Sequence, residues 1–160
     1  AVAAWDGEAD LWLKYKMALA AAKPGARRNV IGGLGSFRDP DLQRKSLSLF
    51  LDGSLRAQDF WSLIGPTLGR PETLAVTWTW LTTNYTKVVE VLGTKSAGSL
   101  PWVGSAFCDK PSKKAVEEFF SHPDHRSPGS DRNLANALES IEICISKRSY
   151  MTPSLKDYLK

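Results

Sequence analysis

The chain has 160 residues, of which 42% are hydrophobic and 24% charged, and its formal net charge is +4. This length and composition are typical of one soluble globular domain, residues 1–160, with a sizeable buried core. The basic residues are scattered rather than gathered in a stripe, which argues against a nucleic-acid partner. No apolar run approaches the ~18 residues of a membrane-spanning helix, so we expect no membrane segment.

The two cysteines, Cys108 and Cys144, both stand among apolar neighbours. Their spacing fits neither a zinc motif nor a redox Cys-x-x-Cys motif. We expect buried free thiols, because free cysteine is commonly a buried residue. This expectation favours a reducing compartment such as the cytoplasm, whereas a disulfide would indicate an oxidising one.

Apolar residues at steps of three and four, bounded by Gly and Pro, predict helices. In chain order these helices span residues 8–22, 26–34, 40–51, 56–68, 71–92, 112–121 and 131–150. Residues 97–108 predict an interrupted helix, and residues 154–160 form either a last short helix or a fraying end. No stretch shows the alternation of a half-buried strand, so we predict no strands.

The helix over residues 40–51 shows the corner chemistry that recurs along the chain. Asp39 is its predicted N-cap and Pro40 its first helical residue, where a missing N–H costs nothing. Gly35 and Gly53 flank it at positions where helix ends favour a residue free to take positive φ. Pro66 should kink the following helix, because it removes one backbone hydrogen bond.

These elements predict an all-α fold. About eight helices, paired at a spacing of about 35–40 residues, are typical of a right-handed superhelix of HEAT- or armadillo-like antiparallel pairs. A compact irregular bundle is the structural alternative. Four of the six tryptophans fall on apolar helix faces and are expected in the core: Trp12, Trp61, Trp78 and Trp80.

We find no catalytic centre in the sequence. The zinc-protease signature of two histidines and a glutamate on one helix turn is absent, as are the nucleophile elbow and the phosphate-binding glycine loops. His122 and His125 are the only histidines, and Pro123 breaks the helix that would aim them at a metal. We therefore read them as surface residues and expect no metal or cofactor in this chain.

The order of the corner motifs resembles the C-terminal helical domain of M1-family zinc aminopeptidases, of the endoplasmic-reticulum aminopeptidase 1-like type. The resemblance covers nearly the whole chain, from about Asp6 to Leu159. It rests on these stretches taken together: Leu34-Gly35-Ser36-Phe37-Arg38-Asp39-Pro40, Leu49-x-Leu51-Asp52-Gly53, Arg56-x-Gln58-Asp59, Trp78-x-Trp80-Leu81-x-x-Asn84-Tyr85, Phe107-Cys108-Asp109, Val116-Glu117-x-Phe119-Phe120-Ser121-His122-Pro123 and Gly129-Ser130-Asp131-Arg132.

The resemblance implies a parent enzyme that removes N-terminal residues from peptides. In such enzymes a separate catalytic domain holds the zinc ion and the catalytic Glu and Tyr, so this chain alone should be inactive and free of zinc. The helical domain closes over the catalytic domain and meets the distal part of the peptide. Its expected partners are therefore the catalytic and N-terminal domains of the same polypeptide, and peptide substrates. The sequence opens at Ala1 without an initiator methionine or a signal peptide, and we expect it to be a piece of a longer protein.

Basic side chains in this family lie near the C-terminus of the peptide, and arginine binds carboxylates bidentately. The resemblance therefore implies substrate-binding roles for Arg38, Arg56 and Arg132, which stand at helix corners or first turns. The alternative is that each arginine braces a corner or is solvated; Arg56 would then pair with Asp59 or Asp52.

A helical-repeat scaffold that binds another protein, with no link to an enzyme, is the functional alternative. The enzyme hypothesis requires a zinc-binding H-E-x-x-H motif elsewhere in the same gene, whereas the scaffold hypothesis forbids it. A capping domain should also expose an apolar patch, which we expect near the N-terminal helix that carries Trp5 and Trp12.

Overall fold

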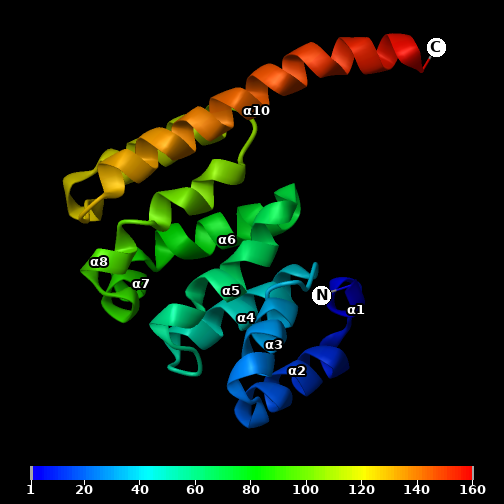
Figure 1. Ribbon diagram of the computed structural model, residues 1–160, viewed down its shortest axis with the longest axis vertical. Helices are drawn as coiled ribbons and strands as arrows, with labels where there is room; N and C mark the ends of the chain where they lie inside the picture. The colour runs from blue at the N-terminus through cyan, green and yellow to red at the C-terminus, as the bar shows by residue number, and fades with distance from the viewer. Residues whose placement is uncertain (1, 160) are drawn as a thin grey trace. The chain divides into compact units, whose positions relative to one another are not determined.

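The computed structural model describes the backbone of residues 2–159 and the side chains of residues 3–152, 158 and 159. In this part of the chain every regular element is a helix, which confirms the all-α prediction (Figure 1). The chain divides into two compact units, one ending at Gly93 and the other beginning at Thr94. A single domain over residues 1–160 and a right-handed superhelix both stay predictions.

The helices of the first unit are α1 (Val2–Trp5), α2 (Ala9–Ala21), α3 (Pro24–Leu34), α4 (Pro40–Leu51), the 3₁₀-helix η1 (Ala57–Asp59), α5 (Phe60–Ile64), the 3₁₀-helix η2 (Gly65–Gly69), α6 (Pro71–Thr83) and α7 (Tyr85–Leu92). Those of the second unit are α8 (Thr94–Ala97), the 3₁₀-helix η3 (Leu100–Ala106), α9 (Lys110–Ser121), the 3₁₀-helix η4 (Pro123–His125) and α10 (Ser130–Tyr158).

The helix α4 forms as its sequence predicts and lies at the centre of the first unit. Asp39 caps it by accepting hydrogen bonds from the backbone N–H groups of Asp41 (3.0 Å) and Leu42 (2.9 Å). Its inner face is fully buried: Leu47, Leu49 and Phe50 are at most 2% exposed. Burying each such side chain stabilises the fold by about 1.5–3 kcal/mol, so α4 anchors the helices that pack around it.

Two buried hydrogen-bond groups join α4 to its neighbours. The indole Nε1–H of Trp12 on α2 donates to Ser46 Oγ at 2.8 Å. The Gln43 amide donates to the Thr73 carbonyl at 2.7 Å and to Thr77 Oγ1 at 2.8 Å, both on α6. Because buried polar groups cost free energy unless they are paired, these bonds fix the positions of α2 and α6 against α4.

The two glycines beside α4 serve different purposes. Gly53 has φ of 84°, which confirms the predicted positive-φ corner. Gly35 has φ of −74°, so the prediction of positive φ there is wrong. A Cβ at Gly35 would lie 2.1 Å from the carbonyl oxygen of Leu63. Glycine is needed at that corner because α5 approaches the backbone closely.

Two predicted helices are divided in the structure. The helix expected over residues 71–92 ends at Asn84, whose φ of −113° and ψ of 18° leave the helical region and separate α6 from α7. The Asn84 amide donates to the Trp80 carbonyl at 2.8 Å, a local bond that competes with the helix. The helix expected over residues 56–68 tightens into 3₁₀ geometry at both ends, and η2 begins at the Gly65–Pro66 pair. A kink at Pro66 stays a prediction.

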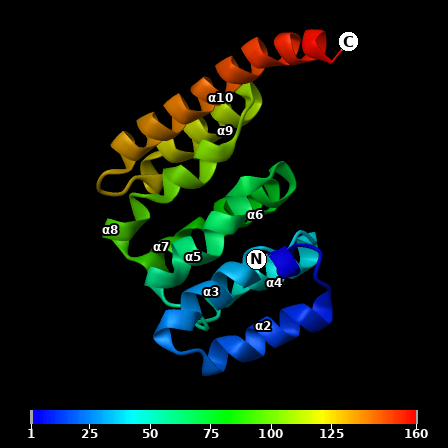
Figure 2. The ribbon, with the colours of Figure 1, turned by 45° about the vertical axis from the view of Figure 1, so that its right-hand side comes forward.

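In the second unit, α10 packs against η3 and α9 (Figure 2). Its inner face buries Leu134, Ala137 and Ile141. The predicted boundary near residue 150 is wrong, because α10 continues to Tyr158 as one helix; Lys160, the end of the predicted last helix, lies outside the described residues. Asp109 caps α9 by accepting from the backbone N–H of Ser112 at 2.8 Å, as its Asp-x-Pro pattern indicates.

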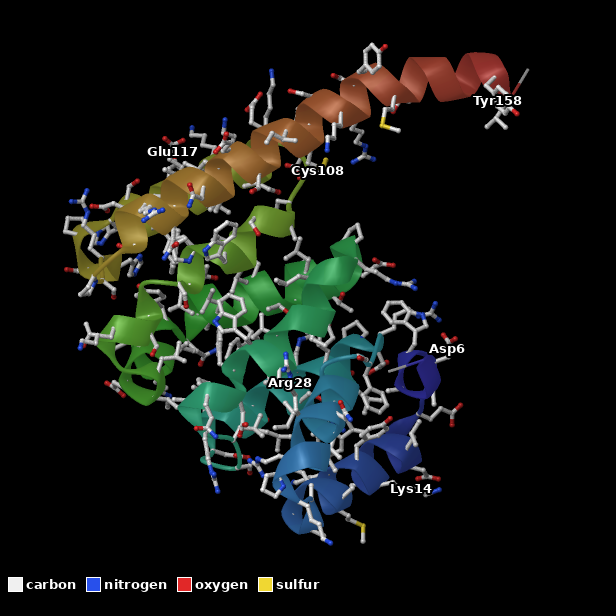
Figure 3. All side chains as sticks on the ribbon, viewed as in Figure 1. Asp6, Lys14, Arg28, Cys108, Glu117 and Tyr158 are labelled. Carbon is white, nitrogen blue, oxygen red and sulfur yellow. A yellow bond between two sulfur atoms is a disulfide. The ribbon has the colours of Figure 1, made fainter. Side chains whose placement is uncertain are left out.

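The prediction of free, buried thiols is wrong. Cys108, just after η3, and Cys144, on α10, form a disulfide with their Cα atoms 5.3 Å apart (Figure 3). This Cα distance lies in the normal range for a disulfide, and it results from the packing of α10 on η3 and α9. Both residues are half-buried rather than buried. With both thiols paired, the cysteines no longer favour a reducing compartment.

Candidate ligand-binding surface

Arg56 lies in a cavity of about 710 Å³ in the first unit, beside the C-terminal end of α2 and the N-terminal end of α3. We call it the Arg27 cavity. It is lined by Leu19, Ala20, Ala22, Pro24, Arg27, Arg28, Arg56, Gln58, Asp59, Trp61 and Ser62. The cavity therefore gathers three guanidinium groups from segments that are far apart in the sequence. One of them, Arg28, is labelled on α3 in Figure 3.

Arg27 is the fixed guanidinium of this cavity. Its Nε and Nη2 both donate to Asp59 Oδ2, at 3.3 and 3.0 Å, and Nη2 also donates to the Ser54 carbonyl at 3.2 Å. The Arg56 backbone N–H donates to the same Asp59 oxygen at 3.1 Å. Arg56 therefore contacts Asp59 through its backbone N–H rather than through its guanidinium. The ion pair with Asp59 is made by Arg27 instead.

The side chains of Arg28 and Arg56 are exposed. Among the residues whose side chains the structure describes, none forms a salt bridge with either of them. Because Asp59 is only 8% exposed and already holds Arg27, it does not neutralise them. The cavity therefore has two guanidinium groups available for an anionic ligand.

Arg38, the second predicted site residue, lies in a different cavity of the first unit. Its Nη2 is 3.3 Å from Asp6 Oδ1, and its guanidinium is 5.8 Å from the centre of the Trp5 ring. Arg70 lies 3.5 Å from the same ring centre, a cation–π contact. Arg38, between α3 and α4, is thus engaged with two side chains at the end of α1.

The cavity beside Arg38, of about 740 Å³, is mostly acidic. Its ionisable lining residues are Asp6, Glu8, Arg38, Asp39, Asp41, Lys45 and Glu72. Several of these carboxylates precede or begin the helices α2, α4 and α6, where they complement the positive end of the helix dipole. This surface does not suit a carboxylate ligand.

Arg132, the third predicted site residue, is exposed in the first turn of α10, in the second unit. No described carboxylate forms a salt bridge with it. The structure therefore places Arg38 and Arg56 in separate cavities of one unit and Arg132 in the other unit. Substrate binding by the three residues stays a prediction.

A salt bridge joins α9 to α10 on the surface of the second unit. The Lys113 ammonium donates a hydrogen bond to Glu142 Oε2. This bond and the positive charge of Lys113, with a smaller contribution from Lys110, lower the pKa of the Glu142 carboxyl below its usual 4.5. The pair favours the observed packing of the two helices while Glu142 is ionised.

The described residues contain no group of three His, Cys, Asp or Glu side chains placed to hold a metal ion. His122 and His125 lie with their ring centres 5.2 Å apart, and His125 stacks on Phe119 at 4.1 Å. In the part of the chain that the structure covers, no helix has the length and apolar character to cross a membrane.

A sequence model of the ERAP1-like C-terminal domain matches residues 1–143. The chain belongs to this family. The resemblance inferred from the order of the corner motifs is thereby confirmed. The matched residues include α1 to α9, all the residues that line the Arg27 cavity, and the first half of α10.

Three curated proteins are similar to this chain, and each is named as an aminopeptidase. Aminopeptidase M1-C of Oryza sativa subsp. japonica is 26% identical over 125 residues, which is 77% of this chain and 14% of the relative. Mitochondrial aminopeptidase 2 of Saccharomyces cerevisiae is 25% identical over 130 residues, 79% of this chain and 13% of the relative. Aminopeptidase M1-D of rice is 25% identical over 119 residues. The chain therefore spans about one seventh of the length of these relatives.

Sequence reasoning missed two parts of the Arg27 cavity in this ERAP1-like domain. Arg27 and Arg28 form one of four basic doublets in the sequence, and without the fold nothing distinguishes this doublet from the other scattered charges. Trp61 was expected in the core, yet it is 39% exposed and lines the cavity. The helical pattern places Trp61 on the apolar face of its helix, and only the packed fold shows that part of its side chain remains exposed in the cavity.

Proposed function

We propose that this chain is the helical C-terminal part of a zinc-dependent aminopeptidase, where it caps the catalytic domain and helps to enclose and bind the peptide substrate. The single observation that carries the proposal is the match of the ERAP1-like C-terminal domain over residues 1–143. The names of the three relatives support it.

The described residues do not fit a zinc site, because no three potential ligands lie together. In this proposal the zinc ion and the groups that activate water belong to another part of the parent polypeptide. This chain contributes binding and shielding. Hydrolysis of a peptide bond is not assigned to any of its residues.

An exposed apolar face on α2 supports contact with the rest of the parent. Leu13 is 51% exposed and Met17 is 73% exposed, and residues four apart lie on the same face of a helix. The exposure of these two residues supports the expected patch near the N-terminal helix, whereas Trp12 is 7% exposed and belongs to the core. Since most of each relative's sequence lies outside the match, we assign this face to another domain of the same polypeptide.

For peptide binding we rank Arg56 first among the three predicted arginines. It lines a cavity with an excess of positive charge, whereas Arg38 is engaged with Asp6 and Trp5. In the full-length parent, Arg56→Gln should raise the KM for long peptides relative to the KM for a single aminoacyl substrate. Arg38→Gln should produce a smaller change in this ratio.

Peptidase assays test the proposal. The chain alone and the full-length product of its gene would be assayed on aminoacyl-p-nitroanilide substrates, each with and without added zinc and a chelator. We expect an inactive chain and an active, chelator-sensitive parent. A parent that binds no zinc and cleaves no substrate would overturn the proposal and leave a helical scaffold that binds another protein.

A further inference from the structure

The Arg27 cavity combines a fixed cation with two available ones. Arg27 is held by Asp59 and Ser54, so its position is set before any ligand binds. Arg28 and Arg56 line the same cavity without a carboxylate partner among the described side chains. Three arginines and one aspartate line the cavity, so the excess of positive charge would attract a ligand with negative charge.

The cavity also has an apolar wall. Trp61 is 39% exposed and is held edge-on against Phe60, with ring centres 5.2 Å apart. Leu19, Ala22 and Pro24 extend this wall. The volume of about 710 Å³ is within the usual range of ligand pockets. Such a lining suits a ligand that carries carboxylates on short hydrocarbon stems, as Asp and Glu side chains do.

We propose that the Arg27 cavity binds the side-chain carboxylates of an acidic peptide segment. Arg28 and Arg56 bind the carboxylates, since guanidinium and carboxylate groups match in planar, bidentate geometry. Trp61 contacts the hydrocarbon stems. The inference goes beyond the proposed function, because it concerns binding by this chain alone and side-chain rather than terminal carboxylates. An inactive parent enzyme would leave it standing.

The charge distribution favours an acidic peptide over a nucleic acid. A phosphate backbone is normally followed by basic residues along a continuous stripe or groove. Here the arginines converge within one concave site, and the cavity beside Arg38 carries more carboxylates than basic side chains. The positive charge is therefore local, which suits a short ligand.

Fluorescence anisotropy of the 160-residue chain with a labelled Glu-rich peptide tests the proposal. Both ends of the peptide are blocked, so that only its side chains carry charge, and a matched peptide has Gln in place of Glu. We expect the Glu peptide to bind at least about tenfold more tightly than the Gln peptide. Affinity should fall with added salt, because the contacts are partly exposed.

Two double variants with the same net charge identify the site. Arg28→Gln with Arg56→Gln should raise the Kd for the Glu peptide about tenfold, the effect of two interactions of moderate strength. The control is Arg44→Gln with Arg148→Gln, two exposed arginines outside the cavity, and it should change Kd by less than about twofold. Circular dichroism melts would show that both variants are folded.

Three results would overturn the proposal. The first is equal weakening by the two double variants, since net charge alone would then explain binding. The second is equal affinity for the Glu and Gln peptides. The third is tighter binding of a single-stranded oligonucleotide that is lost in the Arg28→Gln, Arg56→Gln variant, which would assign the cavity to nucleic acid.

Discussion

Arg27 and Asp59 meet at 3.0 Å between Nη2 and Oδ2, although 32 residues separate them in the sequence. Their side chains are only 21% and 11% exposed. The pair joins α3 to η1, and the same carboxylate oxygen accepts the backbone N–H of Arg56. Since a partly buried charge is costly when its partner is removed, breaking this pair should lower the free energy of unfolding more than breaking an exposed pair of the chain.

The first prediction is that Asp59→Ala lowers the free energy of unfolding by about 2–3 kcal/mol, because it leaves the half-buried guanidinium of Arg27 without its carboxylate partner. Urea unfolding measures the effect. The control is Asp41→Ala, whose carboxylate pairs with Arg44 at 2.6 Å but is 80% exposed; its cost should stay below about 1 kcal/mol. Equal losses in the two variants would contradict the structural role given to the buried pair.

The second prediction concerns the close approach of Gly35 to α5. Gly35→Ala should destabilise the protein by about 1–3 kcal/mol, because the new Cβ would lie 2.1 Å from a backbone oxygen that cannot rotate away. Gly25→Ala is the matched control within α3, since its Cβ would meet nothing within 4 Å. That variant should be neutral or more stable by up to about 1 kcal/mol. Thermal unfolding of both proteins distinguishes the two cases.

The third prediction is that loss of the Cys108–Cys144 disulfide destabilises the second unit. The bridge closes a sequence separation of 36 residues, so its removal should cost roughly 2–4 kcal/mol by the chain-entropy estimate. Unfolding of the wild type with and without reductant measures this cost. The double variant Cys108→Ser, Cys144→Ser should be equally destabilised and should not respond to reductant. Two thiols that react with an alkylating agent in the unreduced protein would show that the bridge is absent.

The fourth prediction is a pH dependence from the Lys113–Glu142 pair. Because the folded state lowers the pKa of Glu142 below 4.5, the pair stabilises the fold at pH values above 4.5. That stabilisation is lost as the pH falls through the lowered pKa, when Glu142 takes up a proton. The Tm of the wild type should exceed that of Glu142→Gln at neutral pH, and the difference should disappear in acid. In a Lys113→Gln background, Glu142→Gln should no longer lower the Tm at neutral pH. If Glu142→Gln still lowered the Tm by the same amount in that background, the assignment to this pair would be contradicted.

Local chemistry explains which parts of the fold the sequence predicts. Asp39 and Asp109 each cap a helix through their own side chains, and such bonds need no knowledge of the tertiary structure. The φ of Gly35 and the state of Cys108 were predicted wrongly for the opposite reason. The need for glycine at position 35 comes from the close approach of Leu63, and the state of Cys108 depends on Cys144; both partners are distant in the chain, and only the packed fold brings them near.

The same distinction applies to the candidate site. Arg56 was selected from its corner motif and does line a cavity. Its neighbours Arg27 and Arg28 come from α3, far from Arg56 in the sequence, so no local spacing along the chain connects them to it. Arg38 has an equally suggestive position in the sequence, but Trp5 and Asp6 engage it. A position between two helices therefore predicts that an arginine side chain is exposed. Only the packing shows whether its guanidinium is already engaged or remains available to a ligand.

The disulfide makes the segment from Cys108 to Cys144 a covalent ring. The exposed loop between α9 and α10, which carries Asp124 and Gly129, lies within that ring. A protease that cuts this loop would leave both pieces attached to each other. The cleaved and intact chains would then run together on a non-reducing gel and separate only after reduction, so a single band without reductant is no proof that the backbone is whole.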